Sequence, residues 1–193
     1  MIVPIIGYGH KILRNACNLV NKTDAELESV IDNLWDTLDA SGGVGLAAPQ
    51  INSSEKIFVI NSRLMYEELS DKQRNECFAG DHGIKEVFVN AQIVERSEST
   101  WKDIEGCLSL PGINEPVERS WQIKIKYQDI NLNRIEKSYS GYTARVIQHE
   151  YDHLNGILFI DHLSGLKKKM LQGKIKQILS GKVDIYYKMS WAK

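Results

Sequence analysis

The sequence has few of the features that mark secreted or membrane-embedded proteins. It contains only three cysteines, Cys17, Cys77 and Cys107, and their spacing shows no paired pattern. An odd and unpaired set disfavours a disulfide framework and is typical of a reducing compartment. No run of about eighteen apolar residues is present, so no membrane span is predicted. The first residues also lack the segments of a secretory signal, and we therefore expect a cytoplasmic protein.

Net charge is almost absent too, but the acidic and basic side chains are unevenly distributed. The formal net charge is −1, with 24 lysines and arginines against 25 acidic residues. From Leu163 onward the only acidic residue is Asp184, and the basic residues are Lys167, Lys168, Lys169, Lys174, Lys176, Lys182, Lys188 and Lys193. The positive charge of this basic segment, about residues 164–193, is complementary to the negative charge of RNA phosphates. A solvated helix face that aids solubility explains the pattern equally well, and we predict no DNA partner.

Length and composition predict one domain, and the order of the predicted helices and strands predicts the α+β class. With 193 residues, 42% of them hydrophobic and 25% charged, residues 1–193 are enough to bury a core without disulfides. Apolar periodicity and turn signals predict helices over residues 23–41, 143–154 and 164–181. They predict strands over residues 56–60, 84–99, 120–128 and 134–140. Residues 62–83 read as a polar excursion with a short helical piece.

The two outer helices are predicted in more detail. Thr23 and Glu26 have the spacing of a capping box at the start of the first helix. The inward-facing residues predicted for the last helix are Leu166, Met170, Ile175, Ile178 and Leu179. We therefore expect antiparallel or mixed β-sheets packed around a central helix, with an N-terminal helix and a C-terminal helix beside them.

The stretch IQHEYDHLNG, residues 147–156, carries the most specific chemistry of the chain. His149 and His153 are four residues apart and lie on one face of a helix, where they can bind one metal ion together. Glu150 is rotated by about 100° from His149, so it can flank the ion and transfer protons. The predicted central helix would then be a metal-binding HExxH helix. The alternative is an ordinary helix with two satisfied or exposed histidines.

The third metal ligand decides which class of protein this motif belongs to. In zincin proteases it is a downstream glutamate or the third histidine of a longer motif. Phe159 stands where that histidine belongs, and no glutamate follows Glu150. His162 lies three residues further on and is a weak candidate. The zincin family therefore does not fit.

A second stretch, DIEGCLSLPG at residues 103–112, offers a different third ligand. Cys107 lies among small and apolar residues close to a proline-glycine turn. As a thiolate it would complete a set of two histidines and one cysteine and leave a fourth position open, as catalytic sites require. The alternative is a buried structural cysteine, which is the usual role of a free thiol.

Three stretches together resemble a known family. GVGLAAPQ, EGCLS and QHEYDHLNG, in that order, are similar to the three signature motifs of the peptide deformylases, which remove the N-formyl group from new bacterial and organellar polypeptides. The resemblance extends from YGHKILR, residues 8–14, to LFIDHL, residues 158–163. It implies formyl-methionyl nascent peptides as substrates and formate as a product.

The resemblance also implies which residues hold the metal and move protons. Cys107, His149 and His153 would bind one divalent ion, and Glu150 would be the general acid and base. The family implies Fe²⁺ as the native ion. The same ligand set is compatible with Zn²⁺, Ni²⁺ and Co²⁺.

Charge stabilisation in the reaction is assigned by the same resemblance. Gln50, the last residue of GVGLAAPQ, would donate its side-chain amide to the developing oxyanion, together with the backbone N–H of Leu108. Taken without the resemblance, GVGLAAPQ could be a flexible loop or a phosphate-binding turn. It lacks the lysine and the spacing of nucleotide-binding loops.

The substrate-binding residues are expected around these groups. The resemblance also implies that Gly45 lies close to the substrate, where a missing Cβ lets backbone and ligand meet. Val44 and Val146 are candidate walls of an apolar slot for the methionine side chain, although such residues are more often plain core. The peptide backbone could pair as an added strand with residues around Leu110 to Gly112.

Three features depart from the family pattern or leave alternatives open. The excursion at residues 62–83 is longer than in compact members, and its Cys77 and His82 form either a second metal pair or a coincidence in a loop. Lys11 stands where a proline is expected. The alternative functions are a zinc metallopeptidase that cleaves internal bonds and a non-catalytic, ribosome-associated metal-binding module. We expect a monomer whose basic C-terminal helix docks on the ribosome.

Overall fold

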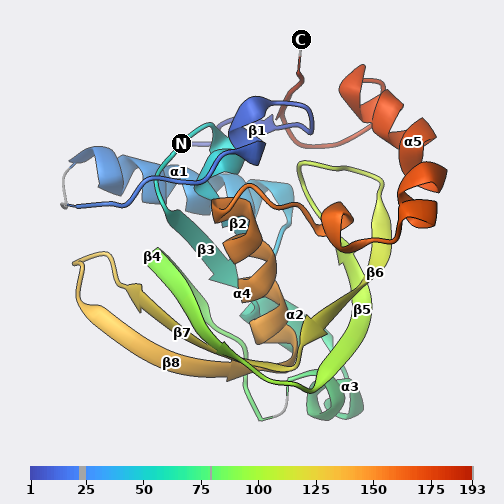
Figure 1. Cartoon of the computed structure of the whole chain (residues 1–193). Coiled ribbons are helices and arrows are strands. Elements are labelled where there is room, and N and C mark those ends of the chain that lie inside the picture. The colour runs from blue at the N-terminus through green and yellow to red at the C-terminus, as the bar shows by residue number, and fades with distance from the viewer. Residues whose placement is uncertain (22–24, 79, 193) are drawn as a thin grey trace.

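The computed structural model describes residues 1–21, 25–78 and 80–192 (Figure 1). Within these residues the α-helices are α1 (Ala25–Ser41), α2 (Arg63–Glu68), α3 (Asp71–Cys77), α4 (Gly141–Leu154) and α5 (Gly165–Leu179). Short 3-10 helices are η1 (Lys11–Arg14), η2 (Ala48–Ile51) and η3 (Phe159–His162). Thr23 of the predicted capping box lies outside the described residues. None of the helices in the described ranges has the length and apolar character needed to cross a membrane.

The strands of the described ranges form three separate sheets. They are β1 (Ile5–Ile6), β2 (Gly45–Ala47), β3 (Ile57–Asn61), β4 (Lys85–Arg96), β5 (Thr100–Gly106), β6 (Asn114–Ser120), β7 (Gln122–Gln128), β8 (Arg134–Ser140) and β9 (Met189–Ser190). The largest sheet has the order β2-β3-β4-β7-β8 with antiparallel neighbours throughout. β5 and β6 form an antiparallel hairpin, and β1 pairs with β9 in parallel. The expected combination of sheets and helices is therefore observed.

The strand β3 explains how two helices come to lie on opposite faces of the large sheet. Successive side chains of a strand point to opposite faces. Ile57 and Val59 pack in the same cluster as the apolar face of α1, whereas Phe58 and Ile60 pack with α4. Because both faces are covered, every position of the segment is buried, which accounts for its unbroken apolar sequence.

The helix α4 lies in the middle of the molecule, between the large sheet and the β5–β6 hairpin (Figure 1). It begins two residues before the predicted start, at Gly141, and ends at Leu154. Its apolar residues pack on the sheet, but its buried residues also include Arg145, Gln148, Glu150, Asp152 and His153. Buried polar groups are costly unless they are paired. The contacts that satisfy them define the site described below.

Two parts of the fold differ from the sequence-based expectation. Residues 62–83 contain two short helices, α2 and α3, rather than one helical piece, and the strands β5 and β6 were not predicted. In α5 the predicted inward face is wrong for Leu166, Met170 and Leu179, which are 71%, 70% and 39% exposed, while Leu171 and Ile178 are buried. Leu171 and Ile178 are seven residues apart and so share one face of the helix, which packs beside the turn that follows Cys107.

Candidate active site

Three potential metal-binding side chains converge from two elements of the fold. Cys107 follows directly after β5, whereas His149 and His153 are one turn apart on α4. One ligand atom from each residue lies within 4.8 Å of the others, and Cys107 Sγ is 3.3 Å from His153 Nε2. The structure therefore brings together the three residues that the sequence singled out.

The three side chains fit a divalent metal ion. A sulfur at about 2.3 Å and a nitrogen at about 2.0 Å from one tetrahedral zinc ion lie about 3.5 Å apart, close to the separation of Cys107 and His153. Burial on its own would raise the pKa of the Cys107 thiol, but the imidazoles of His153 and His149 outweigh it and lower that pKa to about 5. Cys107 is therefore a thiolate at neutral pH, which is the form that binds metals.

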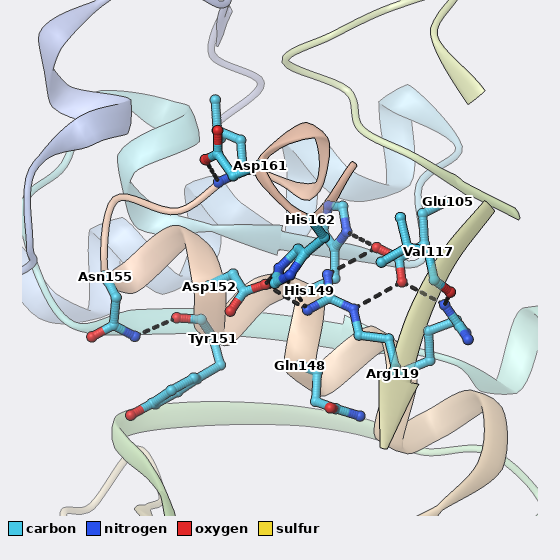
Figure 2. Close-up of polar contacts among 12 residues, drawn as sticks. Glu105, Val117, Arg119, Gln148, His149, Tyr151, Asp152, Asn155, Asp161 and His162 are labelled. Atoms are coloured by element: carbon cyan, nitrogen blue, oxygen red, sulfur yellow. Dashed lines mark hydrogen bonds and ion pairs between the residues drawn. The ribbon is translucent and has the colours of Figure 1, made fainter. Parts of the chain in front are cut away.

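Glu105, on β5, fixes the orientation of His149 (Figure 2). Its Oε2 atom lies 2.9 Å from His149 Nδ1. A carboxylate at this nitrogen holds the proton there and leaves the Nε2 lone pair free for a metal ion. Burial raises the pKa of Glu105, but hydrogen bonds from Arg119 and His149 prevail and hold it well below its usual range. The residue is therefore a fixed negative charge behind the histidine.

Arg119, on β6, extends this contact into a buried ionic network. Its guanidinium donates two hydrogen bonds of 2.9 Å to Glu105 and one of 2.5 Å to Asp152, as Figure 2 shows. Arg145 donates to Glu105 as well, at 2.6 Å. His162, the weak candidate ligand, has its Nε2 atom 2.8 Å from Asp152 and belongs to this network instead.

Glu150 follows His149 on α4 but, unlike Glu105 and Asp152, it forms no ion pair with an arginine among the described residues. Its Oε2 atom is buried and has no hydrogen-bond partner among the described residues. Burial raises the pKa of Glu150 to about 7, because its neighbours His149 and His153 only partly offset the loss of water. A carboxyl group with this pKa can both accept and donate a proton near neutral pH.

Gly45, on β2, leaves the room that the Glu150 side chain occupies. A Cβ atom at Gly45 would lie 2.6 Å from Glu150 Oε1 and 2.8 Å from its Cγ. The position predicted to be close to the substrate is thus also in contact with Glu150.

For the activity that the motif resemblance implies, release of formate from a formyl-methionyl peptide, we expect Gly45→Ala to lower the rate by at least about tenfold, because a carboxylate displaced by about 1 Å acts poorly. The melting temperature should change little in comparison. Gly173→Ala, on the exposed side of α5 where an added Cβ meets nothing within 4 Å, is the matched control. Equal activity in the two variants would contradict this role of Gly45.

Gln50, in η2, has an amide group whose orientation is determined by its neighbours. Its Oε1 atom accepts a hydrogen bond of 2.9 Å from the N–H of Ala47. The Nε2 group must therefore point the other way, where it lies 3.2 Å from Ser109 Oγ and 3.6 Å from Cys107 Sγ. The structure thus presents a fixed N–H donor next to Cys107.

A cavity of about 580 Å³ opens beside these groups. Its lining includes Cys107, His149, Glu150 and Gln50, and His153 is not among the lining residues. The remaining residues that the sequence suggested for substrate binding all reach this cavity as well: Val44, Gly45, Leu108, Leu110, Gly112 and Val146. Two further segments that were not suggested also line it, with Met65 from α2 and residues 184–187 from the C-terminal tail.

Sequence reasoning missed the residues of the ionic network. Glu105 stands within the quoted EGCLS motif, so its closeness to Cys107 in sequence was an available signal. Arg119 carried no such signal, because its role depends on the register that pairs Trp101 of β5 with Arg119 of β6. The ring of His82, one member of the alternative metal pair with Cys77, lies against that of Tyr66, with centroids 5.3 Å apart.

A thiolate, two imidazoles and a buried carboxylate at the wall of a cavity define a metal-dependent hydrolase. The family model for polypeptide deformylase matches residues 2–169, and the chain belongs to that family. A peptide deformylase of Christiangramia forsetii is 42% identical over 98% of this chain and 95% of its own length. A Plasmodium falciparum peptide deformylase, solved as a complex with an inhibitor, has a TM-score of 0.76 at 36% identity, covering 91% of this chain and 99% of its own.

A further solved relative holds a short peptide. It is a class I type b peptide deformylase from Acinetobacter baumannii with Met-Ala-Ser bound, with a TM-score of 0.73 at 30% identity, covering 84% of this chain and 99% of its own. The family resemblance inferred from the three motifs is therefore confirmed. The chain is a hydrolase of protein biosynthesis that acts on newly made polypeptides.

Proposed function

We propose that the chain hydrolyses the formyl group of formyl-methionyl peptides and releases formate and a free amino terminus. The observation that carries this proposal is the convergence of Cys107, His149 and His153 beside the buried carboxylate of Glu150. We further propose that residues 1–193 act as one catalytic domain and that the chain works as a monomer in the cytoplasm.

The proposed metal centre uses the three converging side chains. Cys107, His149 and His153 would hold one divalent ion, and the low pKa of the thiol supports this role. When bound, the ion would polarise the formyl carbonyl and activate water. We propose Fe²⁺ as the native ion, as the family resemblance implies; Zn²⁺, Ni²⁺ and Co²⁺ suit the same ligands.

Glu150 would carry the proton that hydrolysis must move. Addition of water to the formyl carbon forms a C–O bond and sets a proton free, and cleavage of the C–N bond needs a proton on the departing nitrogen. A group with a pKa of about 7 can accept the first and donate the second. The two transfers balance, and the products are formate and the deformylated peptide.

Gln50 and Leu108 would stabilise the negative charge that develops on the formyl oxygen. The Gln50 amide is held with its N–H donors toward Cys107 by the contact with Ala47. The N–H of Leu108 follows Cys107 directly in the chain, at the cavity wall. A fixed donor of this kind typically contributes about 2.7–4 kcal/mol to the stability of the transition state.

The remaining cavity residues would bind the peptide. Val44 and Val146 are proposed to face the methionine side chain, with Gly45 close to the reacting end of the substrate. Residues from Leu110 to Gly112 lie along the cavity, where the peptide backbone could pair with them as an added strand. The Acinetobacter baumannii relative is named with Met-Ala-Ser bound, which supports a short peptide as the ligand.

The proposed reaction is tested by product analysis with formyl-Met-Ala-Ser and acetyl-Met-Ala-Ser. We expect formate from the first peptide and no cleavage of the second when the chain is loaded anaerobically with Fe²⁺. The Cys107→Ser variant should lose metal affinity and formate release together, because a neutral hydroxyl replaces a thiolate ligand. Cys17→Ser, which changes a half-buried thiol outside the cavity, is the matched control. Cleavage of internal bonds in the blocked peptide would instead indicate a metallopeptidase.

We also propose that α5 docks the enzyme on the ribosome. Lys169 and Lys176 are exposed on this helix, as are Leu166 and Met170. Changing both lysines to glutamate should weaken co-sedimentation with ribosomes and reduce the slope of log affinity against log salt by about 2.

The control for this experiment changes two exposed lysines elsewhere on the surface. Lys72 lies on α3 and Lys102 on β5, both exposed, and their change to glutamate should leave ribosome binding unaltered. Binding that does not depend on salt, or that the α5 variant retains in full, would contradict docking through α5.

A further inference from the structure

The C-terminal tail beyond α5 returns to the cavity that contains the candidate active site. Residues 184–187 line this cavity, although they lie far from its other residues in the sequence. We propose that this tail forms a subsite for the peptide residues that follow formyl-methionine, with the ring of Tyr186 as its contact surface. The inference rests on the proposed deformylase function and names a specificity determinant for it.

The tail is held next to this segment, on its C-terminal side. Beyond it, β9 pairs with β1 in parallel, and the N–H groups of Ile5 and Gly7 donate to the carbonyls of Lys188 and Ser190 at 2.9 Å each. A Cβ atom added at Gly7 would lie 3.1 Å from the ring of Trp191. Figure 1 shows the tail returning from α5 toward β1. A segment fixed in this way can form a lasting wall of a binding cavity.

The two tyrosines are attached to the segments that build the site. The hydroxyl of Tyr187 donates to the carbonyl of Leu108, the residue after Cys107, at 2.9 Å. The hydroxyl of Tyr186 donates to the carbonyl of Ser41, at the end of α1, at 2.6 Å. Their rings meet edge to face with centroids 5.3 Å apart. The tail thus connects the metal-ligand loop with the segment that leads into β2.

Residues 42–45 relate the position of Tyr186 to the reacting end of the substrate. Gly45 touches Glu150, and at Gly42, whose φ of +63° suits glycine, an added Cβ would lie 2.9 Å from the Tyr186 hydroxyl. Three residues of chain span at most about 11 Å. A peptide with its formyl group beside Glu150 covers the same distance with the two or three residues that follow. Tyr186 is therefore within reach of the second or third residue of the substrate.

The ring of Tyr186 is available for such a contact. The residue is 78% exposed although its hydroxyl is hydrogen-bonded. An aromatic ring that is anchored at one end and open on its faces gives a large apolar surface at little cost in side-chain entropy. We infer a preference for apolar and aromatic side chains at the second and third positions of the substrate.

The inference is tested with peptides of different length and composition. For Tyr186→Ala we expect kcat/KM for formyl-Met-Phe-Phe to fall about three- to tenfold, mainly through KM, since an aromatic contact of this kind is lost. Turnover of formyl-methionine amide, which is too short to reach the tail, should stay within about twofold. Tyr186→Phe keeps the ring and should retain most of the preference. Lys182→Ala, an exposed change in the same tail, should behave as the unmodified chain.

A binding measurement separates this inference from the proposed reaction. Calorimetry with the product peptide Met-Phe-Phe should show the same three- to tenfold weaker Kd for Tyr186→Ala, and it requires no turnover. If Tyr186→Ala leaves Kd unchanged, or lowers kcat/KM equally for the long and the short substrate, the proposed subsite is wrong. Failure of the unmodified chain to release formate from any formyl peptide would overturn the proposed reaction. The calorimetric comparison would still test whether Tyr186 contributes to peptide binding.

Discussion

Replacement of Glu150 by glutamine is expected to lower kcat for formate release by about 10²–10⁴-fold, the usual contribution of a positioned general acid and base. Glutamine keeps the size of the side chain and its contact with Gly45, but it cannot accept and return a proton. The measurement is formate release from formyl-Met-Ala-Ser under saturating substrate. Because Glu150 is not among the three converging ligands, metal content should remain that of the unmodified chain.

The matched control for this experiment is Glu118→Gln. Glu118 is exposed on β6 and lies outside the residues that line the cavity, so formate release should be unaltered. Full activity of the Glu150 variant with bound metal would refute the role proposed for this carboxylate. Loss of metal together with activity would instead mean that the residue acts through the ligand geometry.

Replacement of Glu105 by glutamine should weaken both the fold and the metal centre. In the structure this carboxylate meets Arg119, Arg145 and His149 at once. Removing one partner of a buried ion pair leaves its counter-charge uncompensated, which costs about 3–5 kcal/mol of the free energy of unfolding. Loss of the carboxylate behind His149 should lower metal affinity by about 10–100-fold. Urea unfolding of the metal-free chain and a competition titration with a chelator measure the two effects.

The pH dependence of stability gives an independent check on Glu105. Its pKa is lowered in the folded state, so its contribution is complete above the unfolded value of about 4.3 and decreases as the pH falls below it. The Glu105→Gln variant should lack this part of the acid destabilisation. Glu136→Gln, which removes an exposed pair with Lys124, should cause no measurable change in stability. Equal unfolding curves for all three proteins would contradict the structural role of the network.

Local patterns predicted those parts of the fold that depend on neighbouring residues. The spacing of His149 and His153 indicated one face of a helix, and the apolar run at residues 56–60 indicated a buried strand; both are observed. The spacing of the apolar residues of α1 predicts one buried face made of Leu27, Val30, Ile31, Leu34, Trp35 and Leu38. Leu27, Ile31, Leu34 and Leu38 are buried, whereas Val30 and Trp35 are half-buried. Helical and strand periodicity are sufficient for these elements, because each buries a face that can be read from its own residues.

The parts that were missed depend on residues far apart in the chain. β5 and β6 are rich in charged and polar residues and show no continuous apolar face, and only the pairing of the two strands brings the side chain of Arg119 onto the same face as Glu105. The lining of the cavity by Met65 and by Tyr186 requires two segments to fold back onto the site. In α5 the apolar residues are spread around the helix, and the choice of the Leu171 face depends on the turn it packs against. No local pattern carries this information.

β1 and β9 stand near opposite ends of the described chain, so they can pair only when almost all of it has been synthesised. Closure of so long a loop is costly in entropy and is expected late in folding. The cluster of Cys107, His149 and His153 spans a much shorter stretch and does not depend on that closure. A metal ion can thus meet its ligands in a chain whose peptide-binding wall is still missing. Maturation of the enzyme would then proceed from the reaction centre outward, with substrate selectivity acquired last.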